Sequence, residues 1–309
     1  MLYAFTGAQY TDVNTKIDYY IVFGGTYDGM NVANDIWRLD LTNYTWEKIK
    51  TQGETLPPSK YPCSFVYENS MYIHGGIPYD SNTTYKEVYE LNLTTFDVSK
   101  TSLGGDKSRY GHEMVMVNNT IYSFGGRDVK GSTYLNSLIG LQMKSKVPFT
   151  DISVNNPPPA RGLFSMVSYN KKIIIFGGQA QVGLLNDIWE YDISSNMWSE
   201  IDDITNHKPS KRYGHSAVMY NDNMILFGGR DGLPPYKYLN DLWSFNFTSR
   251  KWTQMNIHEG IVPKNRLEHK AFIYKNNLHI LGGYMTNFTA KDKINNFIKI
   301  NLEDTSLFG

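Results

Sequence analysis

The sequence predicts an all-β fold in which six four-stranded antiparallel sheets close as a six-bladed β-propeller. Three observations support this: a recurring pair of glycines, a short apolar run before each pair, and apolar/polar alternation without a sustained helical period. The first glycines of successive pairs lie 50 to 54 residues apart. The six pairs are Gly24-Gly25, Gly75-Gly76, Gly125-Gly126, Gly177-Gly178, Gly228-Gly229 and Gly282-Gly283.

Each repeat reads as four strands, and the fifth copy has the clearest pattern. A β-rich stretch at residues 215–220 and a polar turn lead to residues 224–227, which precede the glycines. After a variable loop, residues 240–245 form the expected third strand, and the expected fourth strand carries Trp252. The sixth repeat keeps only residues 304–309 for its fourth strand, so that strand is expected to be short.

A ring of such sheets follows from their faces and edges. An isolated sheet of about 50 residues cannot bury both apolar faces and leaves two unpaired edges, whereas radial repetition covers the faces and protects the edges. The expected blades are residues 1–50, 51–101, 102–153, 154–203, 204–257 and 258–309, forming a single domain, 1–309, that also fits a module of a longer polypeptide. The tryptophans are expected to be largely buried between blades: Trp37, Trp46, Trp189, Trp198, Trp243 and Trp252.

Charge and composition argue against several classes of protein. The chain has 30 basic and 30 acidic side chains and no basic run longer than a pair, whereas binding to a nucleic-acid backbone depends on clustered cations. Nucleic acid is therefore not expected as a partner. The longest apolar runs are far shorter than the roughly 20 residues of a membrane helix, so membrane insertion is not expected either.

The cysteine count and the amino-terminal residues favour an intracellular, cytoplasmic location. Cys63 is the only cysteine, which excludes an intramolecular disulfide and a CxxC motif. The first residues lack the charged start of a signal peptide. Six Asn-x-Thr sequons are the evidence for the alternative, secretion, and they begin at Asn43, Asn82, Asn92, Asn118, Asn246 and Asn287.

The motifs in the repeats resemble those of the kelch family. An apolar residue and Phe-Gly-Gly are followed by Asn-Asp-Ile/Leu-Trp, then by a second tryptophan, and Arg-Tyr-Gly-His opens a repeat at Arg212. The clearest copies run from Phe227 to Trp252 and from Phe176 to Trp198, and the resemblance covers essentially the whole chain. It implies a kelch propeller, a fold that hosts unrelated activities, so the function has to be argued from the site.

Catalytic and metal-binding alternatives have weak support in the residues. His112, His215 and His269 occupy similar repeat positions and could face a common axis, but other repeats place no histidine there, so no ligand set is complete. Oxidases of the kelch fold use a tyrosine crosslinked to a cysteine, for which Cys63 is the only cysteine available. We expect no metal and no cofactor. A kelch-fold enzyme acting on a sugar or small metabolite, mutarotase-like or oxidase-like, remains the alternative.

The variable residues after the glycines predict a binding surface at one mouth of the ring. Variable loops on a constant scaffold commonly carry binding sites, and arginine and tyrosine are enriched at binding hot spots. Lys60 and the arginines that open the repeats lie next to these loops, with bracing of neighbouring loops as the competing role for the arginines. The expected partner-binding residues are Arg127, Asp128, Arg230, Asp231, Tyr284, Arg109, Arg161, Arg212, Arg266, Tyr236 and Tyr238.

The sequence therefore predicts a non-catalytic scaffold or adaptor module that binds another protein. Several guanidinium groups near one mouth would raise the local positive potential despite the zero net charge. An acidic or phosphorylated peptide segment is the expected ligand, because guanidinium groups form charge-assisted hydrogen bonds with carboxylates and phosphates.

Overall fold

The computed structural model describes residues 2–80, 83–128, 133–203, 207–232, 235–256, 263–285 and 297–303. These residues form two compact units, Leu2–Ile152 and Ser153–Gly309. Both units consist of strands and turns, and no α-helix occurs among the described residues, so that part of the chain contains no helix able to span a membrane.

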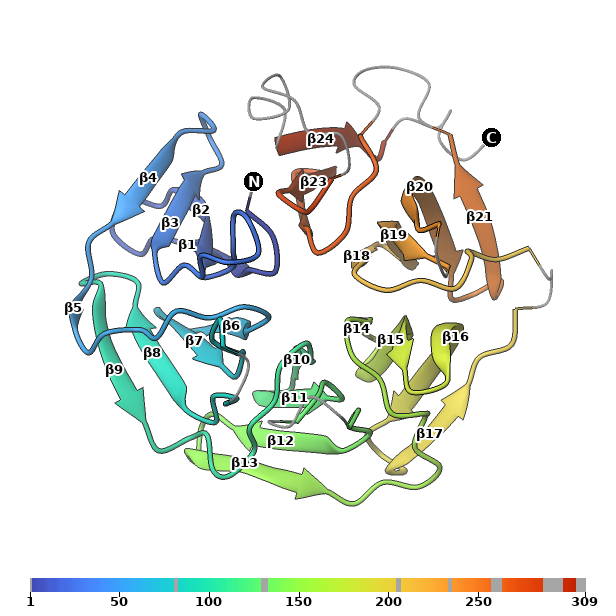
Figure 1. Cartoon of the computed structure of the whole chain (residues 1–309), viewed down its shortest axis with the longest axis horizontal. Coiled ribbons are helices and arrows are strands. Elements are labelled where there is room, and N and C mark those ends of the chain that lie inside the picture. The colour runs from blue at the N-terminus through green and yellow to red at the C-terminus, as the bar shows by residue number, and fades with distance from the viewer. Residues whose placement is uncertain are drawn as a thin grey trace. The chain divides into compact units, whose positions relative to one another are not determined.

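The first unit contains three sheets, and in each of them four antiparallel strands lie side by side in chain order (Figure 1). The first sheet consists of β1 (Thr6–Thr11), β2 (Asp18–Phe23), β3 (Ile36–Asp40) and β4 (Trp46–Ile49). The second consists of β6 (Cys63–Tyr67), β7 (Ser70–His74), β8 (Val88–Asn92) and β9 (Asp97–Thr101), with the short β5 (Gln52–Gly53) parallel to β9. The third consists of β10 (Glu113–Val117), β11 (Thr120–Phe124), β12 (Leu138–Gln142) and β13 (Val147–Ile152).

The second unit repeats this arrangement. One sheet consists of β14 (Ser165–Tyr169), β15 (Lys172–Ala180), β16 (Gly183–Asp192) and β17 (Met197–Glu200). The next consists of β18 (Ser216–Tyr220), β19 (Asn223–Asp231), β20 (Lys237–Asn246) and β21 (Lys251–Met255). The last has three described strands, β22 (Lys270–Tyr274), β23 (Asn277–Leu281) and β24 (Phe297–Asn301).

The predicted fold class, an all-β propeller of four-stranded antiparallel blades, is confirmed. We number the blades 1 to 6 in chain order. The fourth strand expected in blade 6 falls on residues 304–309, which lie outside the described residues.

Apolar side chains on the sheet faces form the core between neighbouring blades of each unit. Between blades 4 and 5, for example, Ile174 and Phe176 pack with Leu226 and Phe245. Because each middle strand is covered on both faces, β7 and β15 read as nearly continuous apolar segments rather than strict alternations.

The tryptophans are less uniformly buried than the sequence predicts. Trp198, Trp243 and Trp252 are buried, whereas Trp37 and Trp189 are only partly covered. The prediction is wrong for Trp46, which is 41% exposed. It lies on β4, an outermost strand in which only the last residue, Ile49, is buried.

The glycine pairs join neighbouring blades. Gly177 and Gly178 both have positive φ, and a Cβ on Gly177 would lie 3.1 Å from the His215 ring of the next blade. Gly178 donates its N–H to the carbonyl of Arg212 over 2.8 Å. Gly228 and Gly229 make the corresponding contacts with His269 and the Arg266 carbonyl. The pairs therefore provide the left-handed backbone and the space that close contact between blades requires.

Candidate functional site

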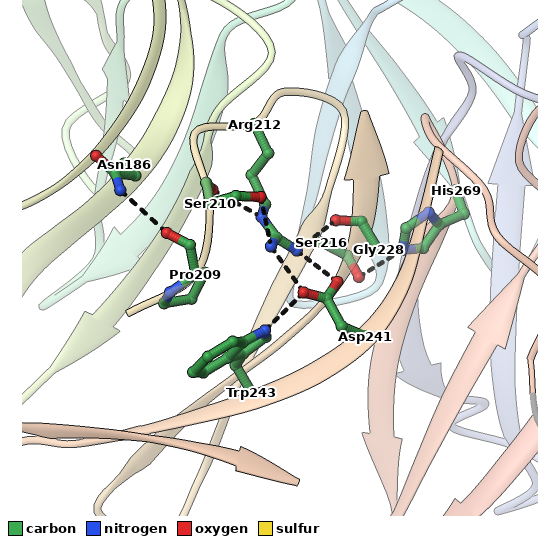
Figure 2. Close-up of polar contacts among 9 residues, drawn as sticks. All are labelled: Asn186, Pro209, Ser210, Arg212, Ser216, Gly228, Asp241, Trp243 and His269. Carbon is green, nitrogen blue, oxygen red and sulfur yellow. Dashed lines mark hydrogen bonds and ion pairs between the residues drawn. The ribbon is translucent and has the colours of Figure 1, made fainter. Parts of the chain in front are cut away.

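The arginines that open the repeats lie inside the blades. Arg109, Arg161, Arg212 and Arg266 are at most 2% exposed. Arg212 binds both carboxylate oxygens of Asp241, over 2.7 and 2.8 Å, and donates to the carbonyls of Gly228 and Ser210 (Figure 2). Such a bidentate pair fixes geometry and satisfies a buried charge.

Arg161 makes the same contacts in blade 4. It binds both oxygens of Asp187 over 2.7 Å and donates to the Gly177 carbonyl over 3.0 Å. Burial alone would raise the pKa of Asp187, but the hydrogen bonds and charge of Arg161 hold that pKa below its usual value. The main-chain carbonyl of Arg212 also accepts a hydrogen bond from Gly178 of the preceding blade. The contacts of these arginines therefore favour the bracing role over direct contact with a partner.

The arginine motif is incomplete in blades 2 and 3. Gly25 donates its N–H to the Ser59 carbonyl, just as Gly178 donates to the Arg212 carbonyl. Ser59, one residue before Lys60, therefore occupies the position that an arginine has in blades 3 to 6. In blade 3 the arginine is present, but Ser137 replaces the aspartate and binds Arg109 over 3.1 Å. Burial lowers the pKa of Arg109 to about 10, because among the described residues no carboxylate forms an ion pair with it.

We expect Ser137→Asp to raise the free energy of unfolding by about 1–2 kcal/mol, because a carboxylate could bind Arg109 as Asp187 binds Arg161. Urea denaturation of the wild type and the variant measures this difference. Ser137→Asn is the matched control, since it has nearly the same shape without the charge. Equal stability of the two variants would contradict the explanation.

The three repeat histidines serve separate contacts between blades. His215 lies 3.0 Å from the hydroxyl of Ser165, and His269 lies 2.8 Å from that of Ser216. His112 packs edge-on against His74, with 5.2 Å between ring centroids. Within the described part of the chain, no three His, Cys, Asp or Glu side chains form a group that could hold a metal ion.

The serine–histidine pairs are poorly suited to nucleophilic catalysis. Burial, with a smaller contribution from the nearby Arg212 charge, lowers the pKa of His215 to about 3. A general base works best with a pKa near the operating pH. These pairs therefore contribute to packing between blades.

An exposed arginine–tyrosine surface lies on blades 5 and 6, and we call it the Arg230 surface. The Arg230 guanidinium lies 3.7 Å from the ring centroid of Tyr236 and 4.8 Å from that of Tyr213. Tyr238 lies beside Tyr284, with 5.9 Å between centroids. The Arg230 surface comprises Tyr213, Arg230, Tyr236, Tyr238 and Tyr284.

Backbone pairing positions these side chains. Arg230 pairs with Tyr213 on one side and with Tyr238 of β20 on the other, because β19 and β20 extend beyond the glycine pair. Tyr236 is 48% and Tyr284 43% exposed, whereas Tyr213 is buried beneath Arg230. Burial raises the pKa of Tyr213 to about 12, and the Arg230 charge partly opposes that shift.

The Arg230 side chain is half-buried and, among the described residues, takes part in none of the ion pairs. Its Nε is buried and has no hydrogen-bond partner in that part of the chain. Contact with two aromatic rings limits the motion of the guanidinium, and its terminal N–H groups are the ones that could bind a ligand. Asp231 is the next residue in the sequence after Arg230, and its backbone pairs with that of Lys237.

A smaller arginine–tyrosine contact lies in the first unit. Arg127 lies 4.6 Å from the centroid of Tyr134 and pairs through the backbone with Tyr110. Asp128 follows Arg127 and donates its N–H to the Thr133 carbonyl over 3.3 Å. Tyr134 is buried, so this contact offers less aromatic surface than the Arg230 surface.

The structure thus separates the predicted site residues into three groups. Arg230, Asp231, Tyr236, Tyr238 and Tyr284 lie together on one unit, and Arg127 and Asp128 lie on the other. The four repeat-opening arginines are interior. Sequence reasoning singled out Tyr134 in its variable loop but missed Tyr213, which could have been found from its position in the repeat beside a variable arginine.

Comparisons with known proteins match these repeats. The family model described as KLHDC2/KLHL20/DRC7 Kelch-repeats domain matches residues 9–108 and 79–283. Kelch domain-containing protein 3 of Homo sapiens is 33% identical over 186 residues, covering 57% of this chain and 47% of that protein.

Two further relatives cover more of the chain. The leucine-zipper-like transcriptional regulator 1 homolog of Drosophila melanogaster is 25% identical over 286 residues, 87% of this chain and 29% of that protein. Tip elongation aberrant protein 1 of Schizosaccharomyces pombe is 30% identical over 220 residues, 67% of this chain and 19% of that protein. The matched regions span less than half the length of each of these curated relatives.

Proposed function

The chain belongs to the kelch-repeat family, and from that premise we propose that it is a non-catalytic scaffold or adaptor module that binds an acidic peptide segment of another protein. The fold and the kelch-domain relatives support a protein-interaction module in general. The observation that carries the finer proposal is the Arg230 guanidinium, held between Tyr213 and Tyr236 without a carboxylate partner in the described part of the chain.

The surrounding side chains favour an extended segment with aromatic or aliphatic residues near its acidic group. Arg230 supplies hydrogen bonds to a carboxylate or a phosphate, and the exposed tyrosines Tyr236 and Tyr284 supply rigid apolar area. A phosphorylated residue would bind the same group more strongly, because it carries more charge and more acceptor oxygens.

The test uses an array of immobilised peptides that contain glutamate, aspartate or phosphoserine, followed by titration of the peptides retained. Arg230→Ala should weaken binding about tenfold, because it removes a charge-assisted hydrogen bond. Binding should also weaken as salt rises, since exposed charges are screened over about 8–10 Å at physiological ionic strength.

Arg250→Ala is the matched control. Arg250 is an exposed arginine of the same blade, and it lies in the turn between β20 and β21, at the strand ends opposite the glycine pair. Its loss removes the same charge without touching the Arg230 surface. Equal effects of the two substitutions, or retention of only neutral peptides, would contradict the proposal.

A further inference from the structure

A groove between blades 2 and 3 belongs to the first unit, shares no residue with the Arg230 surface and plays no part in the proposed interaction. It encloses about 560 Å³, within the range of roughly 300–1,000 Å³ typical of small-molecule sites. The lining residues that matter here are Tyr67, Tyr72, Glu68 and Glu90 from blade 2, and Lys144 and Lys146 from blade 3.

The corresponding position between blades 4 and 5 is occupied by an aromatic ring. Met143 follows β12 and donates its N–H to Asn119, just as Phe247 follows β20 and donates to Asp222. The Phe247 ring stacks on Tyr169, with 4.4 Å between centroids. Tyr67 is the last residue of β6, as Tyr169 is the last residue of β14. Tyr67 lines the groove together with Met143, so the slender methionine side chain stands where blade 5 has the flat ring of Phe247.

The charges that line the groove are separated by blade. Ser70 and Tyr72 donate to the Glu90 carboxylate over 2.7 and 3.0 Å and hold it in place. In blade 4 the matching Glu190 instead pairs with Lys172 over 2.6 Å. Among the described residues, neither groove glutamate and neither groove lysine forms an ion pair.

We propose that this groove binds a small zwitterion of amino-acid or dipeptide size. Carboxylates on one wall attract an ammonium group, and lysines on the other attract a carboxylate. A ligand with a single charge would be attracted by one wall and repelled by the other, whereas a ligand with separated opposite charges satisfies both. The tyrosine rings offer apolar area for the atoms between the two charged ends.

Isothermal titration calorimetry of the full chain with glycyl-tyrosine tests the proposal. N-acetyl-glycyl-tyrosine and glycyl-tyrosine amide each lack one charge, and each should bind about tenfold more weakly or worse. Glu90→Gln should weaken binding of the unblocked dipeptide, and so should Lys144→Ala. Glu190→Gln, the matched substitution in blade 4, should leave this binding unchanged.

A groove-filling variant provides the decisive comparison. Met143→Phe copies the residue found at Phe247 and should abolish dipeptide binding while thermal unfolding stays cooperative. The proposal fails if the unblocked dipeptide gives no heat at millimolar concentration. It also fails if either blocked dipeptide binds equally well, if Met143→Phe binds normally, or if only an uncharged disaccharide binds. Loss of acidic-peptide binding at Arg230 would leave these outcomes unaffected, so the two proposals fail separately.

Discussion

Acidification from about pH 6.5 to about pH 4 should destabilise the protein strongly, because four buried histidines are neutral in the folded state. Burial lowers the pKa of His74 and of His215 to about 3, that of His279 to about 4, and that of His269 well below its usual value. In the unfolded chain these groups take up protons below about pH 6.5. The unfolded state therefore binds more protons in this interval, and stability falls as the pH falls.

Each histidine contributes up to about 1.4 kcal/mol per pH unit across the interval, so the four together contribute up to about 5 kcal/mol per pH unit. Urea denaturation at several pH values measures the slope. His74→Phe is an informative variant, because Phe124 and Phe176 occupy the corresponding positions, directly before the glycine pairs that follow Phe124 and Phe176. It should keep the fold and reduce the slope by about a quarter. A slope equal to that of the wild type would contradict the explanation.

Trp243→Ala should lower the free energy of unfolding by about 3–5 kcal/mol, the usual cost of deleting a large buried aromatic side chain. Trp243 is 6% exposed, packs between blades 4 and 5, and donates its indole N–H to Asp241 over 2.6 Å. The substitution opens a cavity and removes one of the hydrogen bonds that hold the partner of Arg212. Chemical denaturation of purified variants provides the measurement.

Trp46→Ala is the natural comparison for Trp243→Ala. Trp46 is also one of the tryptophans of the repeats, but its side chain is 41% exposed. Its replacement by alanine should therefore lower the free energy of unfolding by about 1 kcal/mol or less. Similar losses for the two variants would show that the burial difference does not determine their stability.

The glycine spacing was sufficient to predict the strand order and the blade class. It works because Gly177 and Gly178 adopt positive φ where the next blade's backbone approaches, a requirement that few other residues meet. The side-chain register was harder to predict. In the connections into blades 2 and 3, the residues with positive φ are Tyr61 and Gly111, so these two positions correspond. Counting back two residues from each aligns Ser59, rather than Lys60, with Arg109, and Ser59 and Arg109 each accept a hydrogen bond from the preceding blade's glycine pair.

The candidate site was only partly predictable for a related reason. Repeat position places Arg212 and Arg230 near one end of a blade, but it does not say which guanidinium finds a carboxylate within its own blade. Asp241 decides this for Arg212, whereas Arg230 lies between two tyrosines. The groove beside Tyr67 could not be predicted at all, because it depends on the size of Met143 in the adjacent blade.

Hydrogen bonds from the second glycine of three pairs report on the separation of neighbouring blades within a unit. The amides of Gly76, Gly178 and Gly229 each donate to a carbonyl of the following blade, so neither partner can be released by fraying within one sheet. Their deuterium uptake should track the opening of one blade from the next, whereas amides inside a hairpin such as β18–β19 can exchange through local motions. Comparing the two classes of amide would measure how tightly successive blades are coupled.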